Sequence, residues 1–127
     1  MRKELKDYNQ KFRVFGRKKG RKSSKNLSAT LLKRYLLDIP SDLISKKIIL
    51  DIGSGTGENT LFLSKENPSK LIIASEIYQD GNIDLCKKLY YKKINNVKIF
   101  DQNILILFDK FRLDNLIKGI WIYFLIH

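Results

Sequence analysis

Three glycines between an apolar run and a helical segment constrain the fold of this chain more than any other feature. They lie in LDIGSGTGE (50–58), as Gly53, Gly55 and Gly57. Glycine adopts positive φ readily and lets the backbone approach a ligand closely. A strand, a glycine turn and a helix in this order are typical of the ligand-binding edge of an α/β sheet.

Short apolar runs alternate with helical patterns along the chain. We expect strands over 46–52, 71–76, 95–101 and 120–126, and helices over 27–37, 58–67, 80–94 and 108–119. Such alternation predicts βαβ units, and runs that are apolar on both faces predict a covered parallel sheet. The expected fold is therefore α/β, a partial Rossmann-like sheet of about four strands in the order 3-2-1-4 with right-handed crossovers. The last strand would be an apolar open edge, which favours aggregation and poor solubility.

The helical periodicity also predicts which side chains face the core. The expected inward residues are Leu31, Leu32, Tyr35 and Leu36 in the first helix, Leu61 and Phe62 in the second, and Ile83, Leu85, Cys86, Leu89 and Tyr90 in the third. Pro40 is expected to end the first helix and Pro68 to stop the second. The single cysteine, Cys86, excludes an internal disulfide, and we expect a small buried hydrophobe rather than a reactive thiol.

Charge divides the chain into two parts. Residues 1–25 hold 11 Lys and Arg against 2 acids, a net +9, whereas the other 102 residues contribute only +3 of the total of +12. We therefore expect a basic N-terminal arm over 1–25 and a folded domain over 26–127. Such an arm suits a polyanion, either a nucleic acid or an anionic membrane, and its alternative is a disordered charged tail.

Other sequence features bear on location and partners. The N-terminus has no apolar h-region, which predicts no signal peptide. The run at 120–126 is far shorter than the roughly 20 residues that span a bilayer. We expect a soluble cytoplasmic protein with no membrane partner and no metal, and its oligomeric state stays open.

The acids around the glycine turn indicate the kind of ligand. A dinucleotide site requires G-x-G-x-x-G, but Glu58 stands at the position of the last glycine, so a pyrophosphate is disfavoured. S-adenosylmethionine carries a ribose diol, an adenine, an amino-acid tail and a cationic sulfonium, which suit carboxylates. Asp51 precedes the turn, Glu76 ends the second strand, where it can accept both ribose hydroxyls, and Asn103 follows the third strand near the expected adenine edge.

Each of these assignments has a structural alternative. The glycines could form a purely structural turn, and Asp51 could brace it. Glu76 could be a solvated acid at a strand end. Asn103 has the weakest support, since Asn is common in loops.

The chain resembles the bacterial tRNA (guanine-N7)-methyltransferases, which methylate a guanine in the tRNA variable loop. The resemblance spans nearly the whole chain and rests on FGRKKGR (15–21), LDIGSGTGE (50–58), Pro68 with ASEI (74–77), and NVKIF (96–100) followed by Asn103-Ile104. The departures in these motifs are Asp51 for the family's Glu and Ala74 for its glycine. The resemblance implies S-adenosylmethionine as cofactor, bound by Asp51, Gly53, Gly55, Gly57, Glu76 and Asn103. It also implies tRNA as partner, with its phosphates held by Arg17, Lys18, Lys19, Arg21 and Lys22.

A further departure follows the expected fourth strand. The family places P-D-P-W there, and its Asp is the proposed catalytic residue, whereas this chain has Leu125-Ile126-His127. Ile126 occupies the position of that Asp, so we expect no catalytic residue, a chain truncated relative to the family, and little activity. The alternatives are an RNA-binding remnant without catalysis and a methyltransferase completed by another chain.

Overall fold

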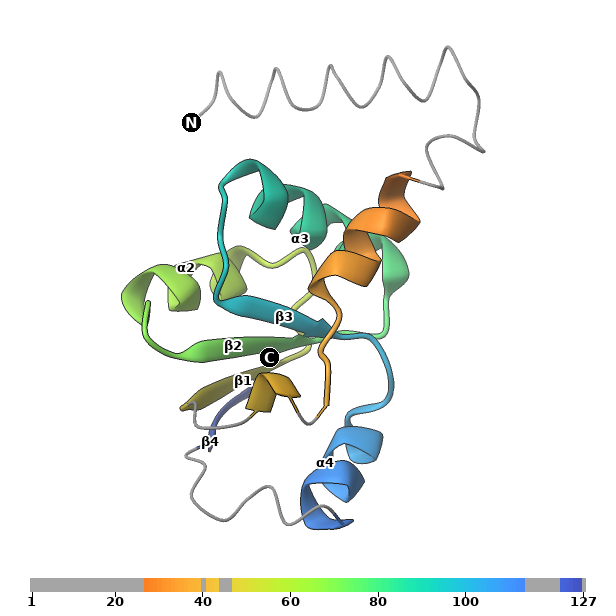
Figure 1. Cartoon of the computed structure of the whole chain (residues 1–127), viewed down its shortest axis with the longest axis vertical. Coiled ribbons are helices and arrows are strands. Elements are labelled where there is room, and N and C mark those ends of the chain that lie inside the picture. The colour runs from red at the N-terminus through yellow and green to blue at the C-terminus, as the bar shows by residue number, and fades with distance from the viewer. Residues whose placement is uncertain (1–26, 40, 44–46, 114–121, 127) are drawn as a thin grey trace.

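A four-stranded parallel sheet forms the centre of the molecule. The computed structural model describes residues 27–39, 41–43, 47–113 and 122–126, so the expected basic arm lies outside it. The strands are β1 (Ile48–Ile52), β2 (Leu71–Ser75), β3 (Val97–Phe100) and β4 (Ile122–Ile126). Their order is β3-β2-β1-β4, and every neighbouring pair is parallel (Figure 1). The predicted fold class and strand order are confirmed.

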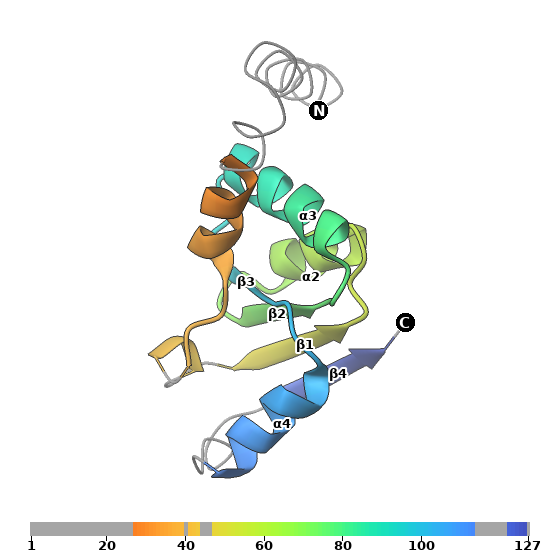
Figure 2. The ribbon, with the colours of Figure 1, turned by 90° about the vertical axis from the view of Figure 1, so that its right-hand side faces the viewer.

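Helices cover both faces of this sheet. The helix over 27–35, α2 (Glu58–Glu66) and α3 (Gln79–Tyr91) lie on one face, and α4 (Ile104–Leu113) lies on the other (Figure 2). A short 3-10 helix, η1 (Ser41–Leu43), contributes Leu43 to the second face. The β1 and β2 side chains alternate between the two cores, with Ile49 and Ile72 in the first and Leu50 and Ile73 in the second. This explains why the central strands are predominantly apolar on both faces.

The direction of the crossovers places a switch point between β1 and β4. The chain moves outward from β1 through β2 to β3 with α2 and α3 on one face. It returns to the other side of β1 by way of α4 on the opposite face. Reversing both direction and face keeps one hand for the connections, as the right-handed rule requires. In open α/β sheets, ligands bind at the carboxyl ends of the strands beside such a point.

The first helix ends earlier than predicted, at residue 35 rather than 37. Leu36 forms a parallel bridge with Ile99, and the Leu37 N–H donates to the Ile99 carbonyl at 2.8 Å. The chain leaves the helix because the outer edge of β3 offers this backbone partner, well before Pro40. The bridge partly covers that edge of the sheet.

Other details of the helix predictions were also wrong. α3 ends at Tyr91 rather than at residue 94, because Lys93 adopts a positive φ. Phe62 is 59% exposed, and α2 instead buries Thr60 and Ser64 against the sheet. Tyr90 is half exposed at the end of α3. The last helix begins at Ile104 instead of 108, because the Asn103 side chain accepts a hydrogen bond from the Leu105 N–H. That first turn is apolar on its exposed side as well, which hides the helical period.

Cys86 behaves as expected. It is fully buried within the core formed by α3 and the first helix. Burial raises the pKa of its thiol to about 12, so it is a packing residue rather than a nucleophile.

Asn96 joins the C-terminal end of α2 to the start of β3. The Asn96 amide donates to the carbonyls of Ser64, Asn67 and Lys70 at 3.1–3.2 Å, and its oxygen accepts from the Ser64 hydroxyl. Asn67 also caps α2 through the Leu63 carbonyl. These bonds close the α2–β2 turn, which sets where β2 begins and therefore where its carboxyl end lies.

We predict that Asn96→Ala lowers the free energy of unfolding by about 2–3 kcal/mol, because carbonyls that it satisfies lose their donor. The neighbouring Asn95 is exposed, so Asn95→Ala is the matched control and should change stability by less than about 0.5 kcal/mol. Urea denaturation measures both. Equal effects of the two substitutions would contradict this account of the turn.

Candidate functional site

The glycine turn adopts the backbone that its sequence predicts. Gly53, Gly55 and Gly57 have φ of 76°, 59° and 93°, values that other residues rarely adopt. The N–H groups of Gly53 and Ser54 both donate to the Ser75 carbonyl, at 2.8 and 3.2 Å. The turn is therefore fastened to the end of the neighbouring strand β2 before it enters α2.

Glu76 binds backbone amides on both sides of this junction. One carboxylate oxygen accepts from the Gly55 N–H at 3.0 Å, and the other accepts from the N–H groups of Ile77 and Tyr78 at 2.9 and 3.2 Å. A carboxylate offers about four acceptor sites, so capacity for hydroxyl donors remains. A fixed carboxylate thus lies against an amide of the glycine turn at the carboxyl end of β2.

The amides of the turn are directed toward the protein. The N–H groups of Gly53 and Ser54 donate to the Ser75 carbonyl. That of Gly55 donates to the Glu76 carboxylate, and that of Gly57 donates to the Ser54 carbonyl. A phosphate cradle needs such groups aimed at the ligand. The arrangement therefore suits a ligand with hydroxyl groups or positive charge better than a pyrophosphate.

The glycines also set the spacing between the turn and α3. A Cβ on Gly57 would lie 2.4 Å from the Leu85 Cδ1, and a Cβ on Gly81 would lie 2.6 Å from the Gly55 carbonyl oxygen. A Cβ on Gly55 would meet no atom within 4 Å. Gly57 and Gly81 permit close packing, whereas Gly55 faces open space in which a ligand can lie.

Asn82, which the sequence did not single out, supports Glu76 from behind. It is fully buried, and its amide donates to the Glu76 carbonyl at 2.7 Å. Its own oxygen and the Ser54 hydroxyl are buried without a hydrogen-bond partner among the described residues. The signal in the sequence was a polar residue on the same helical face as Leu85 and Cys86, where an apolar one is expected.

Asp51 lies inside the protein. It is fully buried on β1, and its carboxylate accepts from the Thr60 hydroxyl at 2.7 Å. This contact joins β1 to the first turn of α2, which is the bracing role that the sequence leaves open for this acid. A role of Asp51 in cofactor binding stays a prediction.

Asn103 stands at the carboxyl end of β3, at the same edge of the sheet as Glu76. The parallel register that pairs Ser75 with Phe100 brings these strand ends together. Asn103 is exposed, and its oxygen caps α4 through the Leu105 N–H at 2.9 Å. Its proposed contact with adenine also stays a prediction.

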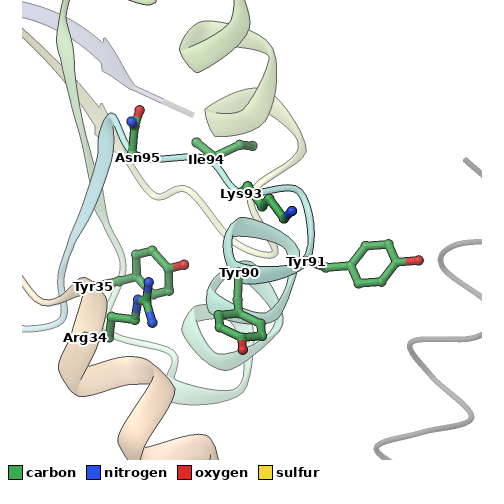
Figure 3. A pocket seen from close by; sticks show the side chains of 7 residues that line it. All are labelled: Arg34, Tyr35, Tyr90, Tyr91, Lys93, Ile94 and Asn95. Atoms are coloured by element: carbon green, nitrogen blue, oxygen red, sulfur yellow. The ribbon is translucent and has the colours of Figure 1, made fainter.

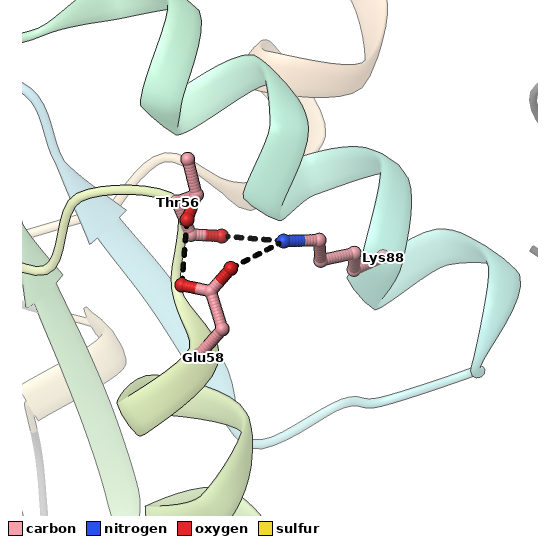
Figure 4. A network of polar contacts seen from close by, with 3 residues as sticks. All are labelled: Thr56, Glu58 and Lys88. Carbon is pink, nitrogen blue, oxygen red and sulfur yellow. Dashed lines mark hydrogen bonds and ion pairs between the residues drawn. The ribbon is translucent and has the colours of Figure 1, made fainter.

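The rim of the turn carries a small polar network (Figure 4). The Lys88 ammonium donates to the Thr56 carbonyl at 3.0 Å and pairs with Glu58 at 3.4 Å. A hydrogen bond from the Thr56 hydroxyl, with smaller contributions from the backbone and Lys88, lowers the pKa of Glu58 below its ordinary value. Lys88 therefore links α3 to the far side of the turn, and Glu58 is an ionised surface group at the start of α2.

The structure describes only one of the remaining predicted site residues, Ile126. Arg17, Lys18, Lys19, Arg21 and Lys22 lie outside the described residues. Ile126 pairs with Ile52 in the β1–β4 register, which brings the end of β4 to the same edge as the turn.

Within the described ranges, no group of three or more His, Cys, Asp or Glu residues could hold a metal ion. Over those same ranges, no helix is long and apolar enough to cross a membrane.

Comparison with known proteins gives a consistent result. Residues 45–125, more than half of the chain, match the model of a family described as putative methyltransferase. A tRNA (guanine-N(7)-)-methyltransferase of Buchnera aphidicola subsp. Schizaphis graminum is 32% identical over 127 residues, covering 90% of this chain and 52% of that protein. One of the same name from Neorickettsia sennetsu is 27% identical over 99 residues, covering 77% of this chain and 45% of that protein. The chain spans about half the length of these relatives.

Among solved structures, the apo form of the S-adenosylmethionine-dependent methyltransferase SibL is similar at 18% identity. The match covers 64% of this chain and 22% of that one, with a TM-score of 0.42. A likeness this distant does not bear on the function.

The packing of Gly81 against the turn yields a prediction. In a helix, Gly→Ala normally stabilises by about 1 kcal/mol, but here the new methyl would collide with the Gly55 carbonyl. We expect Gly81→Ala to lower the free energy of unfolding by about 1–3 kcal/mol. The control is Asp84→Ala on the exposed side of α3, which should be neutral or stabilising. A stabilised Gly81→Ala variant in urea denaturation would show that the turn does not pack as described.

Proposed function

The chain belongs to the family of putative methyltransferases, and from that premise we propose that it binds S-adenosylmethionine and serves methyl transfer to N7 of a guanine in tRNA. The general class follows from the family. The cofactor is supported by the geometry of the turn. The guanine and the tRNA are supported by the sequence motifs at 15–21, 50–58, 74–77 and 96–104 and by the names of the relatives.

The observation that carries this proposal is the Glu76 carboxylate bound to the Gly55 N–H. In a nucleotide-binding turn that amide would be available to phosphate, but here a fixed negative charge lies against it. S-adenosylmethionine lacks phosphate. It has a ribose diol that can donate to Glu76 and a positively charged sulfonium. The open space at Gly55 lies in the same turn.

The bound cofactor would supply an electrophilic methyl group. Guanine N7 has a lone pair and no proton, so the attack needs no strong general base. The main task of the protein is to align the two reactants, which removes much of the entropic barrier. Glu76 and the glycine turn would fix the donor, while a further carboxylate at this edge would be needed to favour the positive charge that develops on guanine.

The basic arm is proposed to hold tRNA phosphates through Arg17, Lys18, Lys19, Arg21 and Lys22. Phosphate contacts orient a nucleic acid without reading its sequence. Counterions that these residues release would make the binding strongly dependent on salt.

We place the catalytic group outside residues 1–127. The resemblance puts Ile126 at the position of the family's catalytic Asp, and an aliphatic side chain cannot stabilise a cation. The end of β4 nevertheless lies at the edge that carries the turn. Residues of the same polypeptide or of a second chain would therefore have to complete the site, and by itself this chain would bind both ligands and transfer methyl groups poorly.

A direct test of the cofactor site is Glu76→Gln. The amide retains the shape and one acceptor but loses the charge, so affinity for S-adenosylmethionine should fall about tenfold or more. Glu66→Gln removes an exposed acid from the end of α2 and should leave affinity unchanged. Equilibrium dialysis with labelled cofactor gives both values. Undiminished affinity in Glu76→Gln would refute the assignment, provided that thermal melting shows the fold intact.

A second test concerns catalysis. Labelled methyl transfer to a tRNA transcript by the purified chain should be near background, and it should rise when cell extract supplies a completing component. Robust transfer by the chain alone would contradict the placement of the catalytic group. Product digestion should reveal 7-methylguanosine, and another modified base would overturn the substrate assignment.

A further inference from the structure

Two segments without acidic residues come together on one face of the molecule. Residues 27–37 and 85–98 contain no Asp or Glu and seven cations, Lys33, Arg34, Lys87, Lys88, Lys92, Lys93 and Lys98. Lys88 is paired with Glu58 at the glycine turn. The first helix packs on α3, since Leu31, Leu32 and Tyr35 share a core with Leu85 and Leu89. The sequence alone attributes the charge to the N-terminal arm, because the acids elsewhere in the chain mask this local excess.

A pocket of about 610 Å³ opens between these two helices. It is lined by Arg34, Tyr35, Tyr90, Tyr91, Lys93, Ile94 and Asn95 (Figure 3). The Arg34 guanidinium lies 5.5 Å from the centre of the Tyr90 ring and 5.9 Å from that of Tyr35. Half of Tyr90 is exposed. The pocket thus combines two cations with accessible aromatic rings, and none of the described residues that line it is an acid.

Lys93 occupies a position that favours glycine. Its φ is 55°, and it is the only residue other than glycine with positive φ in the described part of the chain. The Ile94 N–H donates to the Leu89 carbonyl at 2.9 Å, which makes Lys93 the left-handed residue that ends α3. Glycine would remove the steric cost of this conformation. A lysine here places a cation at the rim of the pocket despite that cost.

We propose that this surface, defined by Arg34, Tyr90 and Lys93, is a second RNA-docking site. Arg34 and Lys93 would bind backbone phosphate, and an unstacked base would lie on the exposed Tyr90 ring. The proposal rests on the proposed function in taking RNA as the partner. Accessible rings beside cations favour RNA over an anionic membrane, and the basic arm leads directly into the helix that carries Arg34.

The position of the surface defines its role. The Tyr90–Asn95 segment leads into the start of β3, whereas Glu76 and the glycine turn lie at the carboxyl ends of the strands. The surface would therefore hold the body of the RNA, away from the reacting base. It would contribute to RNA affinity and leave cofactor binding unchanged.

The substitution Lys93→Gly tests the proposal without endangering the fold. It removes the cation and supplies the residue that the backbone prefers, so the thermal midpoint should stay equal or rise. Affinity for a tRNA transcript should fall roughly three- to tenfold, and the slope of affinity against salt should decrease by about one. Lys110→Gln is the matched control, because it removes an exposed cation from α4 on the opposite face of the sheet.

Two further measurements complete the test. Tyr90→Leu, which keeps the charge, should weaken tRNA binding roughly tenfold through loss of stacking. Both variants should bind S-adenosylmethionine as tightly as the unaltered chain does. If the unaltered chain did not bind S-adenosylmethionine, that result would count against the proposed function alone. Equal losses in Lys93→Gly and Lys110→Gln would overturn the docking site. The docking site would also be overturned if Lys93→Gly weakened binding to phosphatidylserine vesicles but not binding to tRNA.

Discussion

The architecture of the site depends on one carboxylate that binds backbone amides from two segments. Glu76 accepts hydrogen bonds from Gly55 in the β1–α2 turn and from Ile77 and Tyr78 after β2. Bonds from amides to an ionised acceptor are stronger than neutral ones and fix the geometry of both partners. The turn is held in an unusual backbone as a result, and the anion is held at the carboxyl edge of the sheet. The proposed preference for a cationic, hydroxyl-bearing ligand over a phosphate rests on this single placement.

Residues on both sides of the glycine turn fix the position of that carboxylate. Asn82 holds the Glu76 carbonyl from within the core, and Gly81 lets α3 approach the Gly55 carbonyl. Asp51 and Thr60 join the other side of the turn to β1. None of these residues needs to touch a ligand in order to matter for binding. Each restricts the position of a group that would, and a buried polar network of this kind is costly to disrupt.

Much of this could be predicted from the sequence, because local signals and global fold agree. The apolar runs, the three glycines and the acid after the second strand predicted the strand order, the turn and the position of Glu76. Other features depend on tertiary contacts that no local pattern reports. The first helix gives up its last residues to pair with β3, α2 buries Thr60 and Ser64 in place of Phe62, and Asn103 caps α4. The basic surface at Arg34 and Lys93 arises only when two distant segments pack together.

The two ends of the sheet therefore have different proposed roles, with the methyl donor at the carboxyl edge and RNA at the opposite end of α3. The central claim is that the glycine turn and Glu76 together form the donor site. The most direct measurement is a two-dimensional NMR titration of the ¹⁵N-labelled chain with S-adenosylhomocysteine, the demethylated form of the donor. The account predicts that the largest amide shifts occur at Gly53–Gly57, Ile77 and Tyr78, with little change at Tyr90–Asn95. Absent shifts at the turn, or shifts concentrated elsewhere, would contradict it.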